Sequence, residues 1–285
     1  MYSLYSYSIP FSTPLKIKGG VLNERNGIII KYQQNYAEIA PLKYFSAETF
    51  EEALKESKKL IRALSINQTF TPKCPSVQFG LFCLKNPLNN IKRKTPYSTL
   101  FQSPSEILKI IQQQLIQPTQ TIKIKVGLYD FDKELEVIQQ LDKLNFKYII
   151  DANLSISNKQ LDELLCCSQK GLVYIEDPTN DIGKLSTLNV CIGLDELYRF
   201  NKINANRIPR NKIIIKPTMT PINKSFLQTY KPILSSSFES IIGISYIEKL
   251  SSFYNLPSPG TDTLKYFSCD CNNSSDFLTM YCKKI

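Results

Sequence analysis

Six short runs of the chain decide its fold: TIKIKV (121–126), KYIID (147–151), GLVYIE (171–176), VCIGLD (190–195), KIIIK (212–216) and PILSS (232–236). Their β-branched and apolar residues favour strands. Helical patterns lie between some of them, as at 131–144 and 158–167. Repeated strand–helix units of this kind predict a parallel sheet, closed here into a barrel.

A functional side chain stands at or beside the end of each expected strand. These side chains are Lys125, Asp151, Glu176, Asp195, Lys216 and Ser235–Ser237. One of them arrives with each strand–helix unit. The strands of a βα barrel all point the same way, so their C-terminal ends converge on one mouth. The spacing therefore predicts one pocket that gathers carboxylates and lysines.

Three of these residues are carboxylates: Asp151, Glu176 and Asp195. Brought together in a partly dehydrated pocket, they would repel one another unless a cation neutralised them. Oxygen ligands without histidine or cysteine select Mg²⁺, with Mn²⁺ as a possible substitute. We expect these three residues to be metal ligands, with the remaining coordination positions open to substrate or water.

The lysines suggest acid–base chemistry at the same pocket. Strand alternation places Lys123 and Lys125 on one inward face, while Lys216 approaches from the opposite side of the barrel. Two neighbouring ammonium groups beside a dication should lower the pKa of one of them, so that it can act as a base. The combination suits removal of a proton α to a carboxylate, with the metal stabilising the resulting charge.

Composition excludes several other classes of enzyme. The chain has 285 residues and contains no histidine, so catalytic triads, Cys–His pairs and histidine-based metal sites cannot be built. Its net charge is +10, but most of its 35 basic residues are lysines spread along the chain, which does not indicate a nucleic-acid patch. We expect a small-molecule carboxylate substrate, no nucleic-acid partner and no membrane span. The sequence does not predict an oligomeric state.

The eight cysteines and the first residues bear on location. No CxxC pair is present and several cysteines lie in apolar runs, which favours reduced thiols in a reducing compartment. The first eleven residues lack the features of a signal peptide. We therefore expect a soluble intracellular protein, in a bacterial cytoplasm or a plastid stroma.

Residues 1–95 differ from the rest and read as an α+β segment. Alternation predicts strands at 2–9 and 27–32, with turns at Gly19-Gly20 and Asn26-Gly27. A helix is expected over 46–64, with Ser46 as its N-cap and acidic residues in the early turns.

These motifs resemble the enolase superfamily, in its muconate-lactonizing-enzyme subgroup and, within that, the o-succinylbenzoate synthase family. The matching segments run in order from about residue 5 to 265: EIAPL (38–42), FSAET (45–49), PSVQFG (75–80), KIKVGLY (123–129), DAN (151–153), EDP (176–178), DE (195–196), IKPT (215–218), SSSFES (235–240) and GTDT (260–263). The series from K-x-K to Lys216 is typical of the subgroup, and EIAPL, IKPT and SSSFES are more specific.

The resemblance implies an α+β capping domain at 1–95, a modified (β/α)₇β TIM-like barrel at 96–264, and a return of residues 265–285 to the cap. It implies Mg²⁺-dependent syn dehydration of 2-succinyl-6-hydroxy-2,4-cyclohexadiene-1-carboxylate to 2-succinylbenzoate, a step towards menaquinone or phylloquinone. Lys125 would be the base, Lys123 would tune it, and Lys216 would stabilise the enediolate. The implied substrate-binding residues are Ser235, Ser236, Ser237 and Asn153.

Two alternatives remain at this point. An N-acylamino acid racemase or dipeptide epimerase of the same subgroup would use both Lys125 and Lys216 in acid–base roles and would exchange the α-proton of both enantiomers with solvent. A non-catalytic basic binding protein would instead be retained on DNA in a salt-sensitive way without Mg²⁺-dependent turnover.

Overall fold

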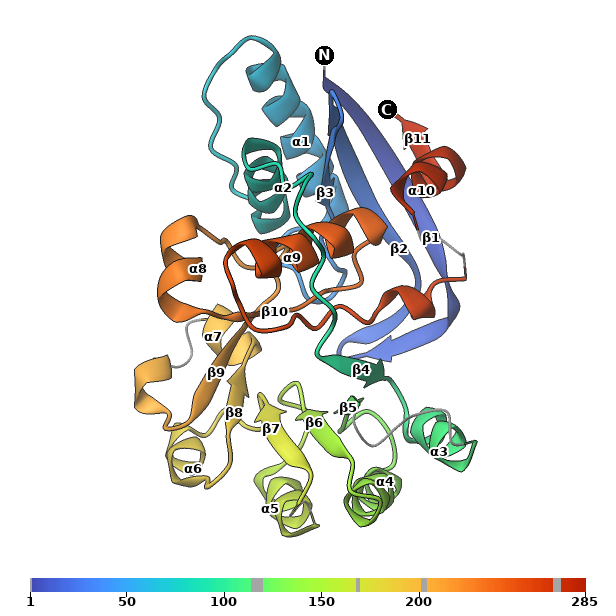
Figure 1. Cartoon of the computed structure of the whole chain (residues 1–285), viewed down its shortest axis with the longest axis vertical. Coiled ribbons are helices and arrows are strands. Elements are labelled where there is room, and N and C mark those ends of the chain that lie inside the picture. Colours follow the sequence, from blue (N-terminus) through green and yellow to red (C-terminus); the bar gives the residue numbers. More distant parts are fainter. Residues whose placement is uncertain (1, 114–119, 168–169, 201–203, 269–272) are drawn as a thin grey trace. The chain divides into compact units, whose positions relative to one another are not determined.

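The computed structural model describes residues 2–113, 120–167, 170–200, 204–268 and 273–285. The chain forms two compact units (Figure 1). Unit 1 comprises Met1–Leu15, Gly19–Pro96 and Ile215–Ile285, and unit 2 comprises Lys16–Lys18 and Tyr97–Ile214. The predicted domain bounds, 1–95 and 96–264, stay a prediction.

Unit 2 is built on parallel strands in the order β9-β8-β7-β6-β5-β4. Their bounds are β4 (Ser98–Phe101), β5 (Thr121–Lys125), β6 (Lys147–Asp151), β7 (Leu172–Glu176), β8 (Ile192–Leu194) and β9 (Asn211–Ile215), the last residue of which falls in unit 1. The register pairs Lys125 with Asp151, and Asp151 with Glu176. The strand ends predicted to carry functional groups therefore lie side by side along one edge of the sheet.

Helices cover one face of this sheet (Figure 1). They are α3 (Pro104–Gln112), α4 (Phe131–Lys143), α5 (Asn158–Cys167) and α6 (Ile182–Thr187), followed by the short α7 (Glu196–Arg199) and the 3₁₀ turn η1 (Ala205–Arg207). Ile122 and Ile124 of β5 pack in the same core cluster as Val137 of α4. Because side chains alternate along a strand, Lys123 and Lys125 face away from that core, as predicted.

Unit 1 contains an antiparallel sheet in the order β11-β1-β2-β3. Its strands are β1 (Tyr2–Ile17), β2 (Gly20–Tyr32), β3 (Asn35–Ile39) and β11 (Cys282–Lys284). The apolar side chains of Ile28, Ile30 and Ile39 pack with those of α1 (Phe50–Ser65) and α2 (Pro75–Lys85) to form the core of this unit. The register of β11 with β1 ties the end of the chain to its beginning, with Ser6 opposite Lys283.

The remaining elements of unit 1 come after β9. They are α8 (Lys224–Tyr230), β10 (Ile233–Leu234), α9 (Ile241–Phe253), the 3₁₀ turn η2 (Leu264–Tyr266) and α10 (Ser274–Tyr281). The Ser235 amide donates a hydrogen bond to the Ile215 carbonyl at 2.8 Å, so the end of β10 runs beside the end of β9. Helix α9 is apolar on most of its surface and contributes Ile244, Ile247 and Leu250 as buried side chains.

Two local expectations for the N-terminal segment are wrong. The N-cap of α1 is Thr49 rather than Ser46: Thr49 accepts from the Glu52 amide while the Glu52 carboxylate accepts from the Thr49 amide. This reciprocal capping box satisfies two backbone donors at once, which a cap at Ser46 would not. Asn26-Gly27 lies inside β2 rather than in a turn, whereas the expected turn at Gly19 is present, with a φ of +95°.

Among the helices that the structure describes, none combines the length and the apolar character needed to cross a bilayer.

Candidate metal and acid–base site

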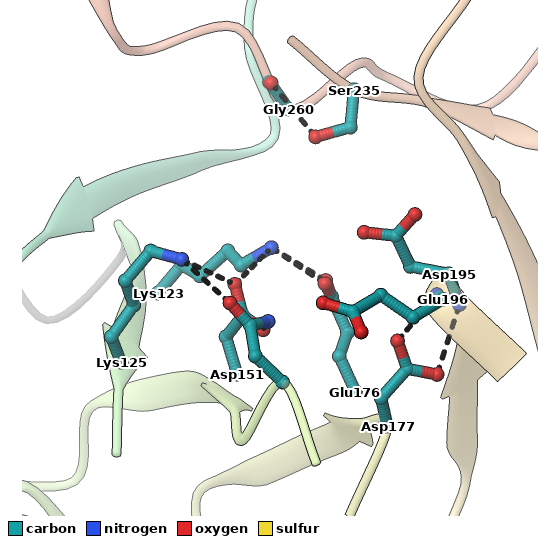
Figure 2. Close-up of polar contacts among 10 residues, drawn as sticks. Lys123, Lys125, Asp151, Glu176, Asp177, Asp195, Glu196, Ser235 and Gly260 are labelled. Carbon is teal, nitrogen blue, oxygen red and sulfur yellow. Dashed lines mark hydrogen bonds and ion pairs between the residues drawn. The ribbon is translucent and has the colours of Figure 1, made fainter. Parts of the chain in front are cut away.

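Lysines and carboxylates from neighbouring strands of unit 2 lie close together (Figure 2), on the face of the sheet opposite the α4 side. The Lys123 ammonium contacts both oxygens of Glu176, at 2.8 and 2.7 Å, and lies 3.2 Å from Asp151 Oδ2. The Lys125 ammonium lies 3.4 Å from the same Asp151 oxygen. The expected association of the K-x-K pair with two of the proposed metal ligands is therefore observed.

The pKa of Lys123 is raised by the carboxylates that its ammonium contacts. Burial by itself would lower the pKa, but the attraction of Asp151 and Glu176 outweighs it, and the pKa lies well above the usual value for lysine. The sequence argument expected a lowered pKa for one lysine of the pair and assigned the role of base to Lys125; that expectation stays a prediction. The carboxylates at hydrogen-bonding distance keep Lys123 charged.

Lys125 has a second polar neighbour in Asn153, whose Oδ1 accepts a hydrogen bond from its ammonium at 3.0 Å. The amide nitrogen of Asn153 donates to Asp151 Oδ1. Asn153 has a φ of +44°, a left-handed conformation that asparagine tolerates better than most residues. Its side chain therefore connects the proposed base to a proposed metal ligand. Its predicted role in substrate binding stays a prediction.

Asp151, Glu176 and Asp195 are each at most 3% exposed. Burial raises the pKa of Glu176 above its usual range; the nearby Lys123 opposes that rise, and repulsion from Asp151 and Asp195 adds to it. A set of buried carboxylates that repel one another is suited to a hard divalent cation. Among the described Asp, Glu and Cys side chains, however, no three surround one common point. The donor chemistry thus fits Mg²⁺, while in this conformation Lys123 lies between two of the carboxylates.

Two carboxylates that the sequence argument did not single out border this cluster. Asp177 is fully buried and accepts hydrogen bonds from the backbone amides of Asp195, Glu196 and Leu197. Glu196 is 6% exposed, and its Oε1 has no hydrogen-bond partner among the described residues. Both residues were visible in the EDP and DE motifs, but only as chain neighbours of the predicted ligands.

Lys18, at the turn between β1 and β2, is a third residue that the sequence argument missed. Its ammonium donates to the Asn153 carbonyl at 2.8 Å and lies 3.6 Å from Glu196 Oε2. Nearby, Lys16 donates to the Leu128 carbonyl at 2.5 Å. These lysines hold the loops that follow β5 and β6. No sequence signal separates them from the other lysines of the chain.

Lys216 and the three serines belong to unit 1. Lys216 follows β9 directly, and its carbonyl accepts hydrogen bonds from the amides of Met219 and Thr220. Ser235 Oγ donates to the Gly260 carbonyl at 3.2 Å (Figure 2), and Ser236 Oγ lies 2.9 Å from Thr263 Oγ1. The approach of Lys216 to the substrate and the role of the serines in binding it stay predictions.

A buried carboxylate, Glu239, organises the serine loop. It accepts hydrogen bonds from the Ser237 amide at 2.7 Å, from Ser237 Oγ at 2.5 Å and from Thr218 Oγ1 at 2.6 Å. Phe238 between them has a φ of +61°, and its carbonyl accepts from the buried guanidinium of Arg25 at 3.0 Å. The loop that follows β10 is therefore tied to the loop that follows β9 and to β2.

Sequence comparison links the chain to a set of bacterial enzymes. The family model described as "MenC, N-terminal domain" matches residues 1–88. An o-succinylbenzoate synthase of Pectobacterium atrosepticum is 26% identical over 92% of this chain and 90% of its own length. One of Yersinia pestis is 27% identical over the same shares of the two chains.

Solved structures share the fold. The o-succinylbenzoate synthase of Thermosynechococcus elongatus, solved with magnesium in its active site, matches with a TM-score of 0.72 at 20% identity, over 94% of both chains. The muconate lactonizing enzyme of Mycobacterium smegmatis, solved in complex with muconolactone, matches with a TM-score of 0.71 at 13% identity. The match covers 99% of this chain and 98% of the other. These likenesses confirm the predicted TIM-like barrel with a capping domain.

Proposed function

Since this chain is a relative of the o-succinylbenzoate synthases and has the fold of the enolase superfamily, we propose that it catalyses their reaction. The reaction is the dehydration of 2-succinyl-6-hydroxy-2,4-cyclohexadiene-1-carboxylate to 2-succinylbenzoate. The observation that carries the proposal is the contact of two lysines from β5 with the strand-end carboxylates Asp151 and Glu176. This arrangement has the acid–base groups and the oxygen donors that the reaction requires.

Lys125 is the proposed base. In its neutral form its amine removes the ring proton α to the carboxylate; the ring hydroxyl then leaves as water by taking that proton back from the ammonium. One C–H and one C–O bond break, a ring double bond forms, and the product is aromatic. Asn153 holds the Lys125 amine from one side, which directs it while the proton moves. Lys123, kept charged by Asp151 and Glu176, places a positive charge beside Lys125.

Asp151, Glu176 and Asp195 are the proposed ligands of Mg²⁺, which when bound would stabilise negative charge on the substrate carboxylate. All three are buried oxygen donors. Mn²⁺ has the same preference for oxygen and is a possible substitute. Lys216 would add positive charge on the side of the substrate that faces away from Lys125, and the hydroxyls and amides of Ser235–Ser237 would bind the succinyl group.

The test follows the ultraviolet absorbance of the cyclohexadiene substrate with Mg²⁺ and after chelation. We expect the absorbance of the substrate to fall when Mg²⁺ is present and to stay constant after chelation. Lys125→Ala should abolish turnover while the circular dichroism spectrum stays unchanged. Lys159→Ala is the matched control, because Lys159 is an exposed lysine of α5 that forms an ion pair with Glu163 on the same helix, and the variant should be fully active. An active Lys125→Ala enzyme would refute the assigned base.

The epimerase and racemase alternative is not favoured. The two relatives cited above, which match nine tenths of the chain in sequence, are o-succinylbenzoate synthases. Three epimerases with a similar structure are 15–18% identical, and that likeness shows the fold alone. None of the cysteines that the structure describes forms a disulfide, and Cys83 is buried. A reducing compartment, bacterial cytoplasm or plastid stroma, therefore stays our expectation for the location.

A further inference from the structure

We propose that Asp177 is a positioning residue that holds the proposed metal ligand Asp195 in place before the metal binds. The inference rests on the proposed Mg²⁺ site. Asp177 itself is not one of the assigned ligands, and it follows Glu176 at the end of β7.

The first argument is the set of hydrogen bonds to the Asp177 carboxylate. Oδ1 accepts from the Asp195 amide at 3.1 Å and from the Leu197 amide at 3.4 Å, and Oδ2 accepts from the Glu196 amide at 2.6 Å. One side chain thus binds three consecutive backbone amides where the chain turns from β8 into α7. The path of the backbone at Asp195 determines where its carboxylate can reach.

The backbone of Asp177 supplies the second argument. Its amide donates to the Gly193 carbonyl at 3.0 Å, and its carbonyl accepts from the Leu154 amide at 2.9 Å. Asp177 therefore connects the ends of β6, β7 and β8, the three strands that carry the proposed ligands. Its φ of +41° shows that the chain takes an unfavourable left-handed conformation to make these contacts.

The third argument is that the site requires a carboxylate. The Asp177 side chain is surrounded by amide donors, and a carboxylate offers two accepting oxygens. An asparagine has the same size and tolerates the same left-handed backbone, but its NH₂ group would face an amide donor. Asp177→Asn therefore removes about half of the hydrogen-bonding capacity without changing the volume or the backbone requirement.

The experiment measures Mg²⁺ binding by titration calorimetry, independently of turnover. We expect Asp177→Asn to bind Mg²⁺ about 10- to 100-fold more weakly than the wild type. Because the three proposed ligands remain, excess Mg²⁺ should restore kcat in Asp177→Asn and not in Asp195→Asn. Unchanged Mg²⁺ affinity in Asp177→Asn would overturn the inference, whether or not the enzyme is active on the cyclohexadiene.

Asp142→Asn is the matched control. The Asp142 carboxylate also binds two consecutive backbone amides, those of Lys170 and Gly171, but at the opposite end of β7. This variant should keep wild-type Mg²⁺ affinity. An equal loss of affinity in both variants would show a general effect on folding and would refute the specific role of Asp177.

A second measurement uses the wild-type chain, so it does not depend on whether a variant folds. In the wild-type chain without Mg²⁺, hydrogen exchange should show the amides of Asp195, Glu196 and Leu197 protected. Rapid exchange of these amides would contradict the inference. A wild-type chain that binds Mg²⁺ without turning over the cyclohexadiene would refute the proposed reaction, and the calorimetric comparison would still decide the role of Asp177.

Discussion

Removal of Lys123 gives the sharpest test of the electrostatics of the cluster. Its ammonium contacts Asp151 and Glu176 at 2.7–3.2 Å, and its side chain is 12% exposed while theirs are at most 3% exposed. Lys123→Met keeps an unbranched side chain of similar length and removes the charge. Two buried carboxylates then lose their shared partner.

The size of the effect follows from this burial. Removing one partner of a buried ion pair costs about 3–5 kcal/mol of unfolding free energy, because the remaining charge stays desolvated.

The loss of stability in Lys123→Met should depend on pH. Burial and repulsion already raise the pKa of Glu176 in the folded state, and without Lys123 that pKa rises further. An acid whose pKa is raised on folding destabilises the folded state once the pH exceeds its pKa in the unfolded chain, about 4.3. The difference between variant and wild type should therefore be largest near neutral pH and shrink towards pH 4.

The assay is urea unfolding of both proteins at pH 4.5 and pH 7, in EDTA and in saturating Mg²⁺. If the carboxylates bind the metal, Mg²⁺ should recover part of the loss in Lys123→Met, since ligand binding stabilises the folded state. Lys184→Met is the control: Lys184 pairs with the exposed Asp162, and an exposed pair contributes at most about 1 kcal/mol. A Lys123→Met protein as stable as this control at pH 7 would refute the reasoning.

Two further predictions concern unit 1. Thr49→Ala should lower the unfolding free energy by about 1 kcal/mol, because it removes the side-chain half of the capping box of α1; a denaturation curve equal to that of the wild type would contradict this cap. Glu239→Gln should raise KM about tenfold with little change in kcat. The substitution replaces the charged acceptor of the Ser237 amide and the Thr218 hydroxyl, so the proposed substrate-binding loop Ser235–Ser237 is held less firmly. Steady-state kinetics would decide this, and a loss confined to kcat would contradict a role in substrate binding.

The strands of unit 2 were predictable because their sequence signal is local. The run 147–151 reads as a strand and is β6 to the residue, and 158–167 reads as a helix and is α5 to the residue. The alternation of TIKIKV also placed Lys123 and Lys125 correctly on one face of the sheet, opposite the α4 side. In each case a short apolar pattern coincides with burial in the finished fold, so no long-range information is needed.

The N-terminal segment was harder to predict for a physical reason. Gly27 lies within β2 because its missing Cβ leaves room for the Tyr7 ring of β1, which a side chain there would overlap. An Asn-Gly pair signals a turn when only local preferences count. Here the packing of Tyr7 against Gly27, twenty residues further along the chain, outweighs the local preference for a turn. A prediction from a short sequence window cannot include such a contact.

The same distinction explains which features of the candidate site could be predicted from the sequence. Strand-end periodicity identifies Asp151 and Glu176, because a single residue per strand–helix unit repeats at a regular spacing. Asp177 breaks that period, and its role depends on amides eighteen to twenty residues away. The charge state of Lys123 likewise depends on which oxygens lie within 3.2 Å of it, and the sequence fixes neither rotamers nor distances. The proposed metal ligands Asp151 and Glu176 can therefore be read from spacing, whereas the residues that hold a ligand in position require the fold.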